Sequence, residues 1–146
     1  MSAPWQIVIA SSDPNQLCRL TEILKHQDVE PICTSTVMEC RNVLVKETVG
    51  LVFCDRNLAD GNYSDLIAAG RSVNSIAKFV VMSPQADWDE FSDAMRFGAF
   101  DVITAPCRPK DVEWMIIQAK RDDRKLAKPF LTSSAGSLVR SAGGSS

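Results

Sequence analysis

Histidine is nearly absent from this sequence of 146 residues: His26 is the only one, and none of the five cysteines forms a Cys-x-x-Cys pair. A zinc site built from Cys and His ligands therefore has little support. A glycine-rich phosphate loop is absent as well, because Ser11-Ser12-Asp13-Pro14 stands where a nucleotide-binding protein would carry GxGxxG or GxxxxGK[ST]. We therefore expect a protein that is not an enzyme, and a small α/β enzyme or nucleotide binder is the least favoured alternative.

Excess charge and long apolar runs are lacking too. The 16 Lys and Arg against 18 Asp and Glu give a net charge of −2, which does not indicate the basic face that nucleic-acid binding normally needs. No apolar run reaches the ~18 residues of a membrane span. Met1–Trp5 lacks the basic and apolar regions of a secretory signal. Because unpaired cysteines are typical of a reducing compartment, we expect a cytoplasmic protein with no direct contact to membrane or nucleic acid.

A regular alternation of strands and helices is what the sequence does contain. Five short apolar runs predict strands at residues 6–10, 30–34, 51–55, 77–82 and 100–104. Apolar residues at helical spacing follow each of them, at residues 14–27, 37–44, 64–72, 87–97 and 109–126. This order predicts right-handed crossovers and a three-layer (βα)5 α/β fold with a doubly wound, five-stranded parallel sheet. On the fourth helix, the residues expected to face the core are Trp88, Phe91, Ala94 and Met95.

The helical pattern ends near residue 126, and residues 1–126 are expected to form one domain. Beyond Pro129 the composition shifts to Ser, Gly and Ala, which is typical of a flexible linker. Residues 127–146 are therefore expected to be a linker-like tail whose few apolar residues either fray or dock. Since about 20 such residues cannot fold alone, the chain is either a stand-alone domain or a piece of a longer protein.

Polar residues stand where the predicted strands end. Leu51–Asp55 is four apolar residues followed by a carboxylate, which predicts a strand buried on both faces with Asp55 at its carboxyl end. Open α/β sheets bind ligands at that edge, although Asp55 could instead cap its own loop. The other strands should deliver to the same edge Ser11, Ser12, Asp13, Ser83, Thr104 and Ala105.

Over roughly residues 5–126, this pattern resembles the receiver domain of bacterial response regulators, which has a flavodoxin-like fold. LVFCDRNLADGNYSDLI (51–67) is similar to the segment that carries the family's phosphoacceptor aspartate. FVVMSPQAD (79–87) is similar to the strand that ends in its Ser or Thr. AMRFGAFDVITAPCRPKDVEWMI (94–116) is similar to its fourth helix, fifth strand and last helix. The three segments recur in the family's order and at its spacing.

The resemblance implies that a histidine kinase passes a phosphoryl group to the central aspartate, which here is Asp55. In the family, two acidic residues after the first strand help to hold Mg²⁺, and a lysine before a proline contacts the phosphoryl group. A Ser or Thr after the fourth strand also contacts it and couples it to the opposite surface. Ser83 matches this hydroxyl, and Pro106 matches the proline, so the Ala105–Pro106 bond is expected to be cis.

The chain departs from the family at most of these positions. The acidic pair falls on Ser11 and Ser12, the lysine on Ala105, and the aromatic switch position on Val102. Mg²⁺ prefers anionic oxygen ligands, and serine hydroxyls bring no charge. Asp13 and Asp55 remain as candidate ligands for Mg²⁺, although Asp13 is favoured as the N-cap of the helix that follows. Asp60 is expected to be solvated.

Two functions follow from this pattern. The favoured one is a pseudo-receiver: a signal-transduction module that binds proteins while its phosphoacceptor site has degenerated. The alternative is a working phosphoreceiver that takes a phosphoryl group on Asp55 and regulates an output such as transcription. The expected partner is a histidine kinase or an output protein. A homodimer through the face of the fourth helix, fifth strand and fifth helix is a further expectation, by analogy with the family.

Overall fold

The structure, a computed structural model, describes residues 5–85 and 87–127. Within these residues the strands are β1 (Gln6–Ala10), β2 (Ile32–Thr34), β3 (Val49–Asp55), β4 (Asn57–Leu58), β5 (Gly61–Asn62), β6 (Lys78–Ser83) and β7 (Asp101–Thr104). The helices are α1 (Pro14–Lys25), α2 (Val37–Lys46), α3 (Tyr63–Ser72), α4 (Trp88–Phe97) and α5 (Pro109–Ala127). The expected alternation of strands and helices is confirmed. The short β4–β5 hairpin was not predicted.

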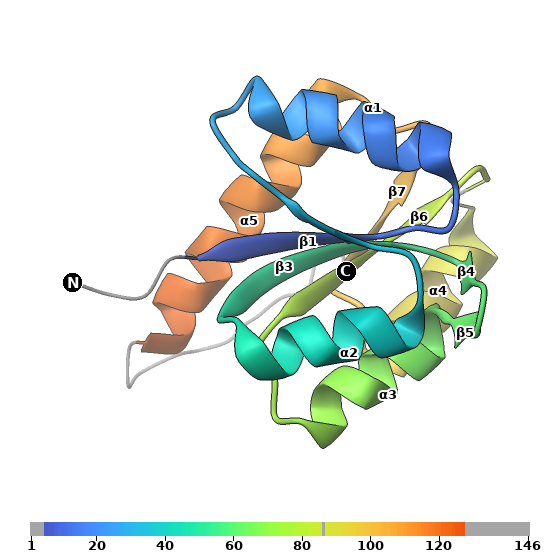
Figure 1. The fold of residues 1–146 in the computed structure, drawn as a ribbon, viewed down its shortest axis with the longest axis vertical. Helices are drawn as coiled ribbons and strands as arrows, with labels where there is room; N and C mark the ends of the chain where they lie inside the picture. The colour runs from blue at the N-terminus through green and yellow to red at the C-terminus, as the bar shows by residue number, and fades with distance from the viewer. Residues whose placement is uncertain (1–4, 86, 128–146) are drawn as a thin grey trace. The chain divides into compact units, whose positions relative to one another are not determined.

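One five-stranded sheet carries the fold, in the order β2-β1-β3-β6-β7 with every pair parallel. The predicted doubly wound parallel sheet is therefore confirmed (Figure 1). β3 lies in the middle, and its residues from Val49 to Cys54 are all buried. The strand begins two residues before the predicted start because Val49 already pairs with Gln6 of β1, which places Gly50 inside the strand.

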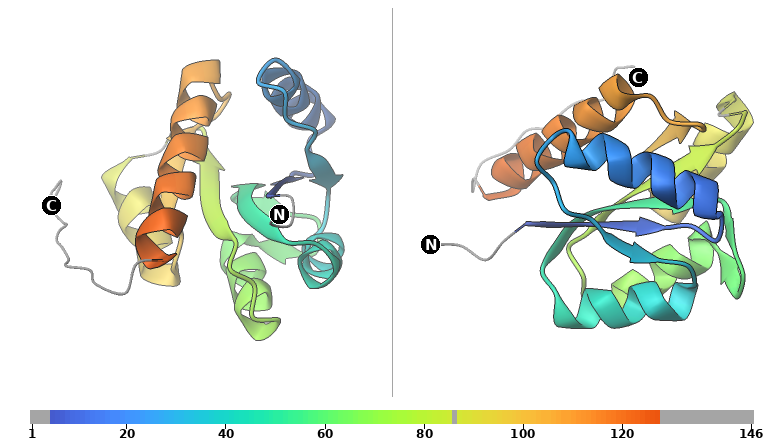
Figure 2. Two further views of the ribbon diagram at one scale, coloured as in Figure 1. Left: turned by 90° about the vertical axis from the view of Figure 1, so that its left-hand side faces the viewer. Right: turned by 45° about the horizontal axis from the view of Figure 1, so that its top comes forward.

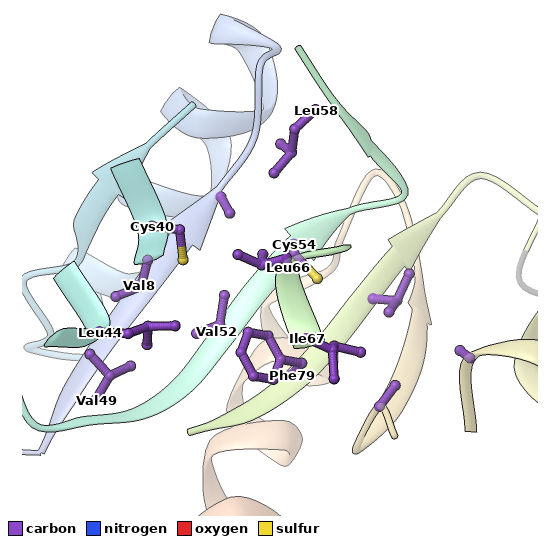
Figure 3. Packing of buried hydrophobic residues seen from close by; sticks show 14 residues of the cluster. Val8, Cys40, Leu44, Val49, Val52, Cys54, Leu58, Leu66, Ile67 and Phe79 are labelled. Carbon is purple, nitrogen blue, oxygen red and sulfur yellow. The ribbon is translucent and has the colours of Figure 1, made fainter. Parts of the chain in front are cut away.

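The two faces of the sheet are filled by alternate residues of each strand. Val52 and Cys54 of β3 belong to one buried cluster with Leu44 of α2 and Leu66 of α3 (Figure 3). Ala94 of α4 belongs to the same cluster, so α2, α3 and α4 all cover this face. Alternation along β3 directs the equally buried Leu51 and Phe53 to the opposite face.

Helix α1 covers that opposite face, and Figure 2 shows it from two further directions. Leu20, Ile23 and Leu24 are its buried residues. Its polar side chains reach the segment that leads into α5: Arg19 Nε donates to the Cys107 carbonyl at 2.9 Å, and Gln27 Nε2 donates to the Pro109 carbonyl at 3.4 Å. The start of α5 is thereby tied to α1.

Side-chain caps begin α1, α3 and α4, and the cap at Asp13 was predicted from the sequence. Asp13 caps α1, with Pro14 in the first turn, and Asp87 caps α4. Asn62 and Asp65 form a capping box at the start of α3. Gly98 ends α4 in the left-handed region, with φ of 102°.

The predicted inward face of α4 was wrong in part. Trp88 is 74% exposed and Met95 is 40% exposed, whereas Ala94 is 1% exposed. The small Ala94 side chain faces the sheet, and Trp88, the first residue of the helix, lies outside that stripe and packs on Phe91 at 5.6 Å between ring centroids. No helical residues precede the first residue of a helix, so the spacing of apolar residues does not decide which way its side chain faces.

The chain divides into two compact units, Met1–Ile116 and Ile117–Ser146, with the boundary inside α5. The described part of the second unit is the C-terminal stretch of that helix, and the tail expected from residue 127 lies, from residue 128 on, outside the described residues. In the described part of the chain, no helix combines the length and the apolar character needed to cross a bilayer. The cysteines are all free, with Cys40, Cys54 and Cys107 buried and Cys18 and Cys33 exposed.

Replacing Gly98 by alanine should destabilise the protein by about 1–2 kcal/mol, because a Cβ strains the left-handed backbone that ends α4. The added Cβ would also meet the Arg71 guanidinium, which is flexible and can move aside. Gly98→Asn is the matched control, since Asn tolerates this conformation better and should lose less. Urea unfolding measures both variants, and equal losses for the two would contradict the backbone explanation.

Candidate functional site at the carboxyl edge of the sheet

Four neighbouring strands end at one edge of the sheet. The register pairs Ala10 with Cys54, Asp55 with Met82, and Ser83 with Thr104. The residues that follow or end these strands therefore meet, as predicted from the sequence. An open pocket of about 500 Å³ lies at this edge, and its lining includes Asp13, Gln16, Arg19, Asp55, Arg56, Ala105 and Pro106.

Asp55 is half-buried at the end of β3 and has two hydrogen-bond donors. Ser11 Oγ donates to its Oδ2 at 2.5 Å, and Gln16 Nε2 donates to its Oδ1 at 3.5 Å. Burial raises the pKa of the Asp55 carboxyl above its ordinary value, and the hydrogen bonds from Ser11 and Gln16 offset part of that shift. The carboxylate is thus held by neutral donors from β1 and α1.

The two serines at the acidic-pair positions have different roles. Ser11 is fully buried, and besides donating to Asp55 its oxygen accepts from the Asp13 backbone N–H at 3.1 Å. Ser12 is exposed and donates to the Ser35 carbonyl at 2.8 Å, while the Ala59 N–H donates to its oxygen at 3.1 Å. Ser11 therefore binds the central carboxylate, and Ser12 ties three loops together.

The two other nearby aspartates are helix caps. Asp13 Oδ1 accepts from the Asn15 N–H at 2.9 Å, which confirms the predicted cap, and Asp13 also lines the pocket. Asp60 was expected to be solvated. It is exposed, and its two carboxylate oxygens also accept from the N–H groups of Val37 and Met38, at 2.7 and 3.1 Å, at the start of α2.

The side chains around Asp55 do not form a set of ligands that fits Mg²⁺. Hard divalent cations need several anionic or carbonyl oxygens directed at one point. Of the candidate ligands, Asp13 is engaged at the start of α1, and the Ser11 hydroxyl points its proton at Asp55 rather than a lone pair at a metal. Among the described residues, no three His, Cys, Asp or Glu side chains gather as a metal-binding group.

Ser83 ends β6 and is fully buried. Its hydroxyl donates a short hydrogen bond to Oε1 of Glu90, in the first turn of α4. The other carboxylate oxygen of Glu90 lies 3.4 Å from Nη1 of Arg56, which directly follows Asp55. The sequence placed Ser83 at the edge correctly, but gave no indication that Glu90 would be its partner.

The remaining predicted positions lie close by. Ala105, at the lysine position, lines the pocket together with Pro106, and the bond between them is cis, as expected. Val102, at the aromatic switch position, is half-buried and lines a second cavity of about 30 Å³ together with Tyr63 and Glu90. Ala105, Pro106 and Val102 therefore lie at or near this edge of the sheet, where the resemblance places them.

Sequence reasoning missed Gln16, Arg19 and Glu90. Gln16 and Arg19 are three residues apart on α1, so both face the pocket, and helical spacing after the Asp13 cap could have indicated them. Arg19 is anchored at the Cys107 carbonyl and brings a guanidinium to the lining. Glu90 lies in the first turn of a helix, where acidic residues are common because they interact favourably with the helix dipole. Its position in the sequence therefore did not indicate the contact with Ser83.

Solved structures with the same fold are receiver domains. A CheY-like response regulator receiver domain protein from Methanospirillum hungatei JF-1 is 20% identical, with a TM-score of 0.72 over 82% of this chain and 97% of that one. The signal receiver domain of an HD domain-containing protein from Pseudomonas fluorescens Pf-5 is 14% identical, with a TM-score of 0.77 over 89% and 96%. A receiver domain from Clostridium thermocellum is 17% identical, with a TM-score of 0.75 over 84% and 99%.

No family model and no curated protein sequence matches the chain. The structural likeness shows that the chain has the flavodoxin-like receiver fold, with its five parallel strands and five helices. At these identities, the likeness concerns the fold.

Asp55→Asn should stabilise the protein at neutral pH. Because the pKa of Asp55 is raised in the fold, the folded state keeps a proton that the unfolded chain has already lost, and stability falls as pH rises through the folded pKa. Asparagine does not ionise, so the variant does not lose this stability as the pH rises. The free energy of unfolding of the variant relative to wild type should therefore rise from about pH 4 towards neutrality, as measured by urea unfolding at a series of pH values.

Asp60→Asn is the control with the opposite sign. The N–H groups at the start of α2 lower the pKa of Asp60, so its contribution is present above the unfolded pKa and is lost as pH falls through the folded one. This variant should lose stability at neutral pH and approach wild type in acid. Parallel pH profiles for the two variants would contradict the assignment.

Proposed function

We propose that this protein is a pseudo-receiver: a non-enzymatic signal-transduction module that acts through protein–protein contacts without a metal-dependent phosphoryl site. The observation that carries the proposal is the hydrogen bond from the buried Ser11 hydroxyl to Asp55, at 2.5 Å. This hydrogen bond gives the Asp55 carboxylate a neutral partner at a position where phosphoryl transfer needs a cation. The reducing setting indicated by the free cysteines supports a cytoplasmic location.

A neutral donor in place of a cation beside Asp55 disfavours phosphoryl transfer because of charge. Attack by Asp55 on a phosphoryl group brings one anion against another, and the developing charge must be neutralised by cations placed in advance. The serines bring none, and Ala105 ends in a methyl group. Arg56 is paired with Glu90.

A working phosphoreceiver is the second candidate, and one observation favours it. Asp55 opens onto a pocket of about 500 Å³ that is also lined by the guanidinium-bearing residues Arg19 and Arg56. An arginine binds phosphoryl oxygens well. In this alternative, Arg19 would supply the cation that Ala105 lacks, and the protein would regulate an output such as transcription after phosphorylation by a histidine kinase.

Mass spectrometry separates the two candidates. The intact protein is incubated with acetyl phosphate, with and without Mg²⁺, in parallel with Asp55→Ala. We expect no gain of a phosphoryl mass in either protein. A gain in wild type that needs both Mg²⁺ and Asp55 would overturn the pseudo-receiver proposal.

A variant that restores the family's residues is the positive control for that experiment. Ser11→Asp, Ser12→Asp and Ala105→Lys combined would return the acidic pair and the lysine. This triple variant should gain one phosphoryl mass in a manner that depends on Mg²⁺ and on Asp55. Adding Asp55→Ala to it should abolish the gain.

The proposed partner surface is the face of α4, β7 and the first half of α5. Large apolar side chains are exposed on these elements: Trp88 at 74% and Met95 at 40% lie seven residues apart on α4, and Trp114 at 51% lies on α5. Aromatic side chains of this kind contribute most of the binding energy at protein interfaces. The partner is a histidine kinase, an output protein or a second copy of this chain, and self-association is the case that needs no further component.

Trp88→Ala should weaken self-association at least about tenfold, because it removes the most exposed aromatic anchor of this face. Sedimentation velocity over a range of protein concentrations measures the effect. Ile76→Ala is the matched control, since Ile76 is 66% exposed but lies in the segment before β6. A wild-type chain that stays monomeric, or an equal loss in the control, would contradict a homodimer through this face.

A further inference from the structure

The Glu90 carboxylate joins the first turn of α4 to the ends of two strands. Its side chain is 17% exposed, and each of its oxygens has a different partner. Oε1 accepts the hydrogen bond from the buried Ser83 hydroxyl, and Oε2 lies 3.4 Å from Nη1 of Arg56. One anion thus takes a donor from the end of β6 and a cation from the end of β3.

Ser83 and Arg56 are two groups near Asp55 that can bind an anion. Arg56 directly follows Asp55 and lines the same pocket, and Ser83 ends the neighbouring strand. A hydroxyl has a single proton to donate, so the Ser83 proton that goes to Glu90 is not available to another acceptor. The carboxylate offers two anionic oxygens, which is the chemistry that phosphoryl oxygens would present.

The contacts of Glu90 also fix the position of α4. Its backbone N–H donates to Asp87 Oδ1 at 3.0 Å, so Glu90 belongs to the capped first turn of the helix. Its side chain joins that turn to the ends of β6 and β3. The Arg56 carbonyl in turn accepts from the Tyr63 N–H, at 3.0 Å, at the start of α3. The contacts of the α4 turn with Ser83 and with Arg56 thus depend on one carboxylate.

We propose that Ser83 and Arg56 form an anion-binding site whose ligand is the Glu90 carboxylate of the same chain, and that this internal ligand holds the first turn of α4 against the sheet edge. The inference rests on the proposed function, because it explains how α4 keeps one position without a phosphoryl group on Asp55. The ligand class of the site is a carboxylate or phosphate oxyanion. Glu90 fills it permanently, at a local concentration that no free anion reaches.

Amide hydrogen exchange tests whether Glu90 keeps α4 in place. Glu90→Ala should speed the exchange of the α4 amides about tenfold at neutral pH, while the amides of β1 and β3 keep their wild-type rates. Asp89→Ala is the matched control, because Asp89 is the other acidic residue in the first turn of α4 and its loss changes the helix-end charge equally. Equal exchange of α4 in Glu90→Ala and wild type, or the same acceleration in Asp89→Ala, would overturn the inference.

Inorganic phosphate is the probe for the vacated site. In Glu90→Ala, adding phosphate should shift the amide resonances of Arg56 and Ser83 with saturation, and wild type and Asp89→Ala should bind it at least about tenfold more weakly. Equal phosphate affinity in all three proteins would contradict an internal ligand. Because neither experiment involves phosphoryl transfer, both can be repeated with Asp55→Ala. Phosphorylation of wild type would then overturn the proposed function alone, whereas unchanged α4 exchange would overturn the role of Glu90 alone.

Discussion

Burial of β3 on both faces is the constraint on which the rest of this structure depends. Once Val49–Cys54 is enclosed by helices on either side, the polar groups of the molecule can gather only where the strands end. Asp55 stands at that point, with strands on both sides delivering Ser11 and Ser83 to its level. The chemistry of the edge then follows from which side chains those neighbours carry, because the backbone geometry is set by the sheet.

At this edge, the polar groups that end two of the strands bind side chains of the same chain. A hydroxyl proton from Ser11 binds Asp55 at the level of the acidic pair, and a carboxylate from α4 binds the Ser83 hydroxyl. The two contacts differ in electrostatic sense. At Asp55, the protein supplies neutral donors to a carboxylate whose pKa is raised by burial. At Ser83, it supplies a carboxylate to a neutral hydroxyl.

The sequence predicted the fold closely, since apolar runs and the Asp13 cap are local signals. It also placed Asp55, Ser11 and Ser83 together, because parallel strands share an edge. It could not assign Glu90 or Asp60, since the pairing of a helix-end carboxylate with Ser83, or of a loop carboxylate with α2, depends on tertiary position. The exposure of Trp88 was missed for a similar reason: at the first residue of a helix, periodicity does not decide orientation.

Ser12 has a consequence for how the edge can move. Its hydroxyl joins the loop after β1 to Ser35, before α2, and to Ala59, in the β4–β5 hairpin. Asp60 adds two bonds between that hairpin and the same helix. The loop after β1, the start of α2 and the β4–β5 hairpin are thus joined by four hydrogen bonds. A displacement of any one of these three segments is therefore transmitted to the other two, and through the loop after β1 to Ser11 and its partner Asp55.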